Sequence, residues 1–292
     1  MKKFVIALFS VTVATLSCNA QLLWKITGNN LDKPSYLFGT HHVAPITVLD
    51  SVPGFNDALN SVDKVYGELI MSEANTPQTQ QIMMQAGMAP QDSTLTAVLS
   101  AAQADSLDTM LKKYMGPMAG IAQFNALKPA MVSTVISMVQ AQMAFPTFNM
   151  QEQLDSEIQN RGAALGKEIG GLETIEEQCQ ALFGSSIIDQ ADDLMNMVRN
   201  DNRSLEMAHK LAKAYLAGDL NAMLALIEEP EMGMGTGADR LINNRNANWV
   251  RFMAGLLPTA SVLIAVGAGH LPGDKGLISL LRKSGYTVTP VE

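Results

Sequence analysis

The feature that most constrains this chain is a pattern near both of its ends: a strand-like run, a Gly-x-x-His segment, a helix and another strand. The first copy covers residues 36–70 and the second covers residues 263–291. In open α/β sheets, ligands gather beyond the carboxyl ends of the strands. The repeat therefore predicts a sheet built from both ends of the chain, with the two corners facing one cleft.

Short apolar and β-branched runs predict the strands of this sheet. The first two runs flank a loop that contains Gly28 and Pro34, so we expect them to pair as a hairpin. Helices are expected at residues 52–60, 242–257 and 277–283. The expected strands cover residues 22–26, 35–38, 64–70, 261–266 and 286–291.

Between about residues 75 and 235 the apolar side chains follow helical spacing instead. One predicted helix, with Ser106 as its expected N-cap, carries four apolar side chains on one face: Leu107, Met110, Leu111 and Tyr114. The glycine-rich segment 233–237 is expected to be a loop that returns to the sheet. We predict a single α/β domain over residues 21–292, in which a mixed sheet is covered by helices and carries a helical insertion at about 75–235.

The first twenty residues have the three-part pattern of a secretory signal peptide. Two lysines precede an apolar run over residues 4–16, and residues 18–20 supply a small residue for cleavage. That run is too short to cross a bilayer as a stable anchor. We expect cleavage after Ala20, no later membrane span, and export to the periplasm, cell surface or medium. Lipid attachment at Cys18 is the alternative.

The composition of the chain limits which partners it is expected to bind and which residue types could hold a metal ion. The net charge of −8 comes without any block of basic residues, so nucleic acid is not an expected partner. Only Cys179 would remain after cleavage, which excludes an internal disulfide and a four-cysteine zinc site. A metal ion would have to be held by histidine, aspartate or glutamate, and the chain has only four histidines.

Three residues of these types converge in the predicted fold. His42 and His270 each follow a strand in a Gly-x-x-His corner, and Glu68 lies near the end of a neighbouring strand. Two imidazoles and a carboxylate suit Zn²⁺, Mn²⁺, Fe²⁺ or Co²⁺. An ion with an open coordination position lowers the pKa of bound water and polarises a carbonyl. No Gly-x-Ser-x-Gly elbow is present, so a serine hydrolase is not expected.

A series of different short motifs follows in a fixed order through residues 22–292. They are Trp24-Lys25-Ile26, Tyr36-Leu37-Phe38-Gly39-Thr40-His41-His42, Val65-Tyr66-Gly67-Glu68, Leu154-Asp155, Gly171-Leu172-Glu173-Thr174, Tyr215 with Gly218-Asp219-Leu220, Asn244-Arg245-Asn246, and Val266-Gly267-Ala268-Gly269-His270-Leu271. This ordered set resembles the TraB/GumN family, which includes the Tiki-type proteins. The resemblance implies a fold related to the erythromycin-esterase and ChaN-like haem-binding superfamily, with a mixed sheet under helices.

The resemblance also implies an activity. Tiki-type members are metal-dependent proteases that clip an amino-terminal segment from secreted signalling proteins, and Mn²⁺ or Co²⁺ supports them. Carried over by motif, the active centre would consist of His42, Glu68 and His270. We therefore favour an exported metalloprotease-like hydrolase that uses Mn, Co or Zn and acts on a peptide or protein substrate. Glu68 would be either the third metal ligand or the general base.

Arg245 is the further catalytic candidate, on the family pattern. It could orient Glu68 or stabilise the charge that develops on a substrate oxygen; a structural salt bridge between helix and sheet is the alternative. Asn246 is a weaker candidate of the same kind. Asp155 and Glu173 are expected to hold helices together.

His41 could be an additional ligand or a supporting group, and we favour an exposed neighbour without a role.

Two other interpretations of the site remain open. A haem-, metal- or partner-binding protein could use the same histidines without turnover, and Glu68→Gln would then leave binding intact. Alternatively, both corners are structural, and loss of either histidine would lower the melting temperature with or without metal.

Overall fold

The computed structural model describes residues 21–229 and 237–291. The predicted signal peptide and residues 233–236 of the predicted loop lie outside this part of the chain. Within it, six strands form one sheet in the order β4-β3-β5-β2-β1-β6. The strands are β1 (Leu23–Gly28), β2 (Ser35–Thr40), β3 (Lys64–Gly67), β4 (Glu168–Gly171), β5 (Val262–Gly267) and β6 (Tyr286–Pro290).

The sheet is mixed, as the sequence predicts. β1 and β2 form the expected antiparallel hairpin, and β6 pairs antiparallel with β1. β2, β5, β3 and β4 are mutually parallel neighbours. The two ends of the chain therefore build the sheet together. The short strand β4, from the middle of the chain, was not predicted, because Glu-Ile-Gly-Gly has too few β-branched side chains to stand out.

The register of β2 and β5 brings the two histidine corners together. Thr40 of β2 lies opposite Gly267 of β5, and both strands run in the same direction. Both strands end at this pair, and after each of them the chain leaves the sheet and enters a histidine corner. The predicted juxtaposition of the two corners is confirmed at the level of the backbone.

Helices cover both faces of the sheet. Side chains alternate between faces along a strand, so Val65 and Tyr66 of β3 point in opposite directions. Val65 packs against Gly162 of α9 (Leu154–Ala164), where a Cβ atom on the glycine would lie 2.7 Å from the valine side chain. The Tyr66 ring meets Phe252 of α14 (Asn244–Leu256) at 5.9 Å. Thus α9 covers one face and α14 the other.

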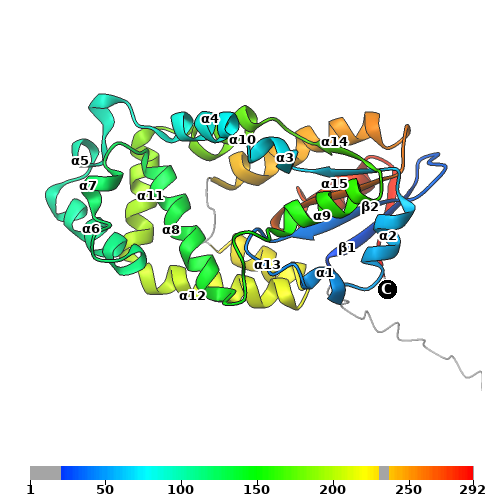
Figure 1. Ribbon diagram of the computed structural model, residues 1–292, viewed down its shortest axis with the longest axis horizontal. Coiled ribbons are helices and arrows are strands. Elements are labelled where there is room, and N and C mark those ends of the chain that lie inside the picture. Colours follow the sequence, from blue (N-terminus) through cyan, green and yellow to red (C-terminus); the bar gives the residue numbers. More distant parts are fainter. Residues whose placement is uncertain (1–20, 230–236, 292) are drawn as a thin grey trace, which may run out of the picture.

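The remaining helices include those that extend away from the sheet at the left of Figure 1. They are α1 (Val48–Ser51), α2 (Phe55–Ser61), α3 (Met71–Ala74), α4 (Pro77–Gly87), η1 (Gln91–Ser93), α5 (Leu95–Val98), α6 (Ala101–Met115), α7 (Ile121–Phe124), α8 (Pro129–Ala144), α10 (Ile175–Phe183), α11 (Ile187–Arg199), α12 (Asp201–Leu216), α13 (Leu220–Ile227), η2 (Asp239–Asn243), η3 (Ala268–His270) and α15 (Leu277–Lys283).

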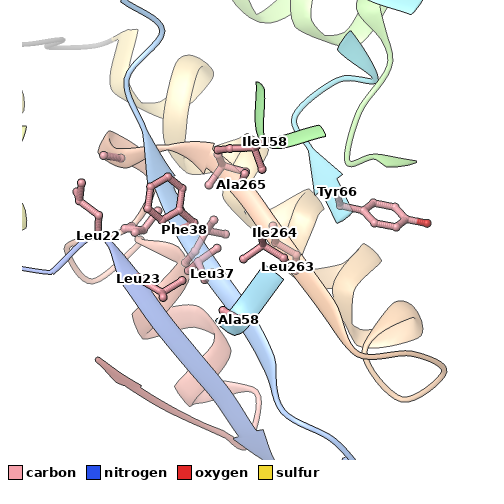
Figure 2. Packing of buried hydrophobic residues seen from close by; sticks show 14 of the residues in the cluster. Leu22, Leu23, Leu37, Phe38, Ala58, Tyr66, Ile158, Leu263, Ile264 and Ala265 are labelled. Atoms are coloured by element: carbon pink, nitrogen blue, oxygen red, sulfur yellow. The ribbon is translucent and has the colours of Figure 1, made fainter. Parts of the chain in front are cut away.

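Two apolar cores hold these layers. The larger core surrounds the sheet, where Leu37, Phe38 and Ile264 are fully buried (Figure 2). A separate core joins α5, α6, α8 and α11 through side chains that include Leu107 and Ile136. The predicted stripe on α6 therefore packs inside the helical part. The predicted cap was wrong: α6 begins earlier, with Ser100 in a capping box with Gln103, because that pair satisfies the first free N–H groups.

None of the helices in the described part of the chain combines the length and apolarity needed to cross a membrane.

Candidate functional site

The two Gly-x-x-His corners pack directly against each other. Gly39, at the start of the first corner, faces Ala268 of the second, and a Cβ atom on Gly39 would lie 3.0 Å from the Ala268 Cβ. A contact this tight is uncommon between real Cβ atoms and would require Ala268 to move by a few tenths of an ångström. Glycine at the first position therefore lets the corners share one edge of the sheet.

His270 is fixed in a single tautomer by Asn246 of α14. The Asn246 amide nitrogen donates to the backbone carbonyls of His270 and Lys275 at 3.1 and 2.9 Å. Its oxygen must then accept from His270 Nδ1, which lies 2.7 Å away. The His270 ring therefore carries its hydrogen on Nδ1 and presents a lone pair on Nε2.

Burial keeps this imidazole neutral. The His270 side chain is 5% exposed, and the Trp249 ring lies 4.5 Å from it, centroid to centroid. Burial lowers the pKa of His270 to about 4, with the nearby Arg245 charge acting in the same direction. At neutral pH His270 can act as an acceptor or a metal ligand through Nε2.

Glu68 follows β3 directly and is held on both carboxylate oxygens. Oε1 accepts from the Gly267 backbone N–H at 2.8 Å. Oε2 accepts from Arg245 at 2.6 Å and from Gln178 of α10 at 3.3 Å. Burial alone would raise the pKa of Glu68, but attraction to His270 and Arg245 outweighs it and lowers the pKa to about 2. Glu68 Oε1 lies 3.8 Å from His270 Nε2.

Arg245 uses every N–H of its guanidinium inside the protein. Nε and Nη2 donate to the two carboxylate oxygens of Glu173 at 3.0 and 2.6 Å. Nη2 also donates to Glu68, and Nη1 donates to the Leu241 carbonyl at 2.9 Å. Nη1 lies 3.1 Å from His270 Nε2, whose lone pair it meets. These contacts account for the five donors of an arginine.

Glu173 is a site residue that the sequence analysis assigned to helix packing. The Leu172 and Glu173 N–H groups both donate to the Glu68 carbonyl, at 3.0 and 3.1 Å, so the turn after β4 lies beside the end of β3. The Glu173 side chain is 5% exposed and pairs with Arg245. Recognising residues 168–171 as a strand would have identified it, because a carboxylate then follows the carboxyl end of a strand, as in Glu68.

His42 has a carboxylate partner. Its Nδ1 lies 2.9 Å from Asp155 in the first turn of α9, and Thr40 donates to the other Asp155 oxygen at 2.7 Å. The His42 side chain is 60% exposed. The Asp155 charge, together with the hydrogen bond to that carboxylate, raises the pKa of His42 to about 9. Asp155, also assigned to helix packing from the sequence, orients His42 and leaves Nε2 for a ligand.

His41 is not the exposed residue that the sequence analysis favoured. Its ring is partly buried against Phe145 at 4.8 Å and Tyr215 at 5.3 Å. Burial lowers the pKa of His41 to about 4, and Nδ1 has no hydrogen-bond partner among the described residues. His41 lines a groove of about 440 Å³ together with residues of α8, α11 and α12 and with Leu241 of η2.

The donor types at this site fit a first-row divalent ion. His270 Nε2 presents a lone pair, which Arg245 meets, an oxygen of the ionised Glu68 lies 3.8 Å from that nitrogen, and Asp155 bonds Nδ1 of His42 and not its Nε2. Among the residues that the structure describes, no three His, Cys, Asp or Glu side chains form a group that could hold an ion as they stand. The site therefore has suitable donors, and Arg245 occupies two of them.

Fold and site together define an α/β protein in which two Gly-x-x-His corners and a buried glutamate–arginine pair share the carboxyl edge of parallel strands. The model of the TraB/PrgY/gumN family matches residues 22–290. The chain belongs to this family.

Proteins that resemble the chain carry the name metalloprotease. Metalloprotease TIKI2 of Danio rerio is 26% identical over 91% of this chain and 60% of its own length. Metalloprotease TIKI1 of Homo sapiens is 25% identical over 91% of this chain and 61% of its own. The chain thus spans about three fifths of the length of these relatives. No solved structure matches it.

Proposed function

We propose that the chain is a metal-dependent hydrolase of peptides or proteins, with its centre at Glu68, His270 and His42. One observation carries the proposal: an ionised, buried carboxylate lies 3.8 Å from the lone-pair nitrogen of a neutral, buried histidine. The family and the names of its relatives support a metalloprotease-like activity. Export remains a prediction from the sequence.

The proposed ligands are His270 Nε2, His42 Nε2 and a Glu68 oxygen. When bound, the ion supplies a water molecule of lowered pKa and polarises the scissile carbonyl. Asn246 holds His270 in the tautomer with a lone pair on Nε2, and Asp155 orients His42 through Nδ1, so an ion that binds His42 Nε2 would displace its proton.

The surroundings of Glu68 favour the role of ligand over that of general base. Its two oxygens accept hydrogen bonds from Gly267, Arg245 and Gln178, and its pKa is lowered to about 2. A carboxylate of such low pKa is a weak base at neutral pH. Arg245, with each N–H already in use, suits the task of orienting Glu68 better than that of contacting a substrate oxygen.

The groove beside His41 is the proposed binding place for the substrate chain. Its volume of about 440 Å³ is that of a small-molecule or side-chain site. Apolar side chains of three helices line it, among them Ala141, Met197 and Leu211. His41 of its lining directly precedes His42 in the chain, which connects the groove to the proposed centre through adjacent residues.

The test combines metal analysis with a peptide-library cleavage assay in Mn²⁺, Co²⁺ or Zn²⁺. We expect cleavage that chelation abolishes and metal restores, and that Glu68→Gln eliminates. Glu176→Gln makes the same charge change on the exposed face of α10 and should leave cleavage unchanged. Silence of the wild type with every metal would refute the peptidase proposal. A retained metal would then favour the binding protein.

A further inference from the structure

Arg245 occupies two atoms that the proposed centre would offer to an ion. Its Nη1 is 3.1 Å from His270 Nε2, and its Nη2 is 2.6 Å from Glu68 Oε2. The lone pair of a neutral imidazole nitrogen can be given to one N–H or to one metal ion, but not to both. The guanidinium is therefore a resident cation in the place where the ion would bind.

The other contacts of Arg245 show which of its bonds an ion would have to replace. Two bonds to Glu173 and one to the Leu241 carbonyl do not involve His270 or Glu68. The Trp249 ring supports the guanidinium from 4.6 Å. These contacts can persist while Nη1 gives up His270. Arg245 can thus remain in the site with a bound ion, as a second positive charge beside it.

We propose that Arg245 sets the strength of metal loading: its N–H blocks His270 Nε2 in the metal-free protein, and its charge weakens the binding of an ion. The proposal rests on the proposed function only in taking His270 as a ligand. Arg245 Nη2 donates to both Glu68 and Glu173. Because Glu173 takes part of the positive charge, Arg245 does not fully neutralise Glu68. The chain thereby carries a built-in competitor that keeps the ion exchangeable.

Two features of the site argue for competition rather than for simple structural pairing. A helix-to-sheet salt bridge requires only the bonds to Glu68, from Nη2, and to Glu173, from Nε and Nη2. The additional Nη1 contact with His270 contributes nothing to the neutralisation of those carboxylates. It does occupy the nitrogen that Asn246 has left with a lone pair.

The experiment measures the affinity of the purified protein for Mn²⁺, Co²⁺ and Zn²⁺ by competition with a chromophoric chelator. Arg245→Met keeps an apolar stem over Trp249 and removes both the N–H and the charge, so each ion should bind at least about tenfold more tightly. Arg245→Lys keeps the charge without the fork and should give an intermediate increase. Arg251→Met removes the same charge from an exposed position of α14 and should bind as the wild type does.

Each outcome decides the proposal. Equal or weaker binding by Arg245→Met would overturn it, and should that variant fail to fold, Arg245→Lys gives the same decision by the same comparison. Tighter metal binding by the variants, with no peptide cleavage by any of them or by the wild type, would support the proposed competition by Arg245 and refute the proposed peptidase activity. Peptide cleavage by the wild type, with unchanged metal affinity in the variants, would support the peptidase activity and refute the competition by Arg245. Failure of every folded variant to bind any of the three ions would refute both.

Discussion

His270 and His42 follow the ends of neighbouring parallel strands, yet their surroundings differ. The His270 side chain is 5% exposed and bonded to an amide, whereas the His42 side chain is 60% exposed and paired with a carboxylate. Their pKa values move in opposite directions, to about 4 for His270 and about 9 for His42. The same short motif therefore presents one neutral imidazole and one that favours the protonated form.

The difference teaches that the motif and the chemistry come from separate parts of the chain. Gly-x-x-His fixes where the imidazole emerges from the sheet. The protonation state comes from a residue on a helix that is distant in sequence: Asn246 of α14 for His270, and Asp155 of α9 for His42. The predictions that follow test whether the two corners serve one centre despite this difference.

The largest expected effect is on turnover. If both imidazoles hold the same ion, His42→Ala and His270→Ala should each lower kcat/KM on a cleaved peptide on the order of 10³-fold, because each removes a ligand. Steady-state hydrolysis measures this. His209→Ala, on the exposed face of α12, is the matched control and should leave kcat/KM unchanged. A large loss in only one corner variant would mean that the corners do not share a centre.

The second prediction concerns the stability that Asn246 gives to the buried corner. Asn246→Leu removes bonds to two carbonyls and to His270 Nδ1, and leaves those buried groups unpaired. The free energy of unfolding should fall by about 2–4 kcal/mol, as measured by urea denaturation. Asn244→Leu, at an exposed position of the same helix, should change it by about 0.5 kcal/mol or less.

A smaller contrast is expected between the histidines themselves. His270→Ala leaves a gap beside Trp249 and an unpaired Asn246 oxygen, so we expect a loss of about 1–3 kcal/mol in metal-free buffer. His42→Ala removes a mostly exposed side chain whose pair with Asp155 is screened by solvent, and should cost about 1 kcal/mol or less. Equal losses in the two variants would contradict the assignment of one buried and one exposed corner.

The sequence predicted those parts of the fold that depend on local pattern. The hairpin, β5, β6 and the joining of the two chain ends followed from apolar runs and from a repeated corner. The structure also brings Glu68, Arg245 and His270 together, as the motifs indicated. What stayed out of reach was β4, whose two glycines hide a strand, and with it the role of Glu173.

The partners of the histidines could be predicted least well. Asp155 lies 113 residues from His42, in the first turn of a helix where acidic residues are common for reasons of capping and dipole. Nothing local distinguishes it from Glu157 of the same turn. His41 was misjudged because burial depends on Phe145 and Tyr215, which come from two different helices or their ends.

The smallest effect, and the most direct test of the contrast, is the titration of His42 in metal-free protein. Its pKa lies above the ordinary value of 6.5 because of Asp155, so this pair favours folding most below pH 6.5 and loses that contribution as the pH rises through about 9.

Asp155→Asn keeps the shape of the side chain and should bring the pKa of His42 down by about one to two units. NMR of the imidazole carbon-bound protons measures this shift, with Asp50→Asn, at an exposed position of α1, as the control that should leave the pKa of His42 unchanged. His270 should show no titration between pH 5 and 8 in either variant, since burial lowers its pKa to about 4. An ordinary pKa for both histidines would mean that the two corners are chemically alike, and the assignment of separate partners to them would be wrong.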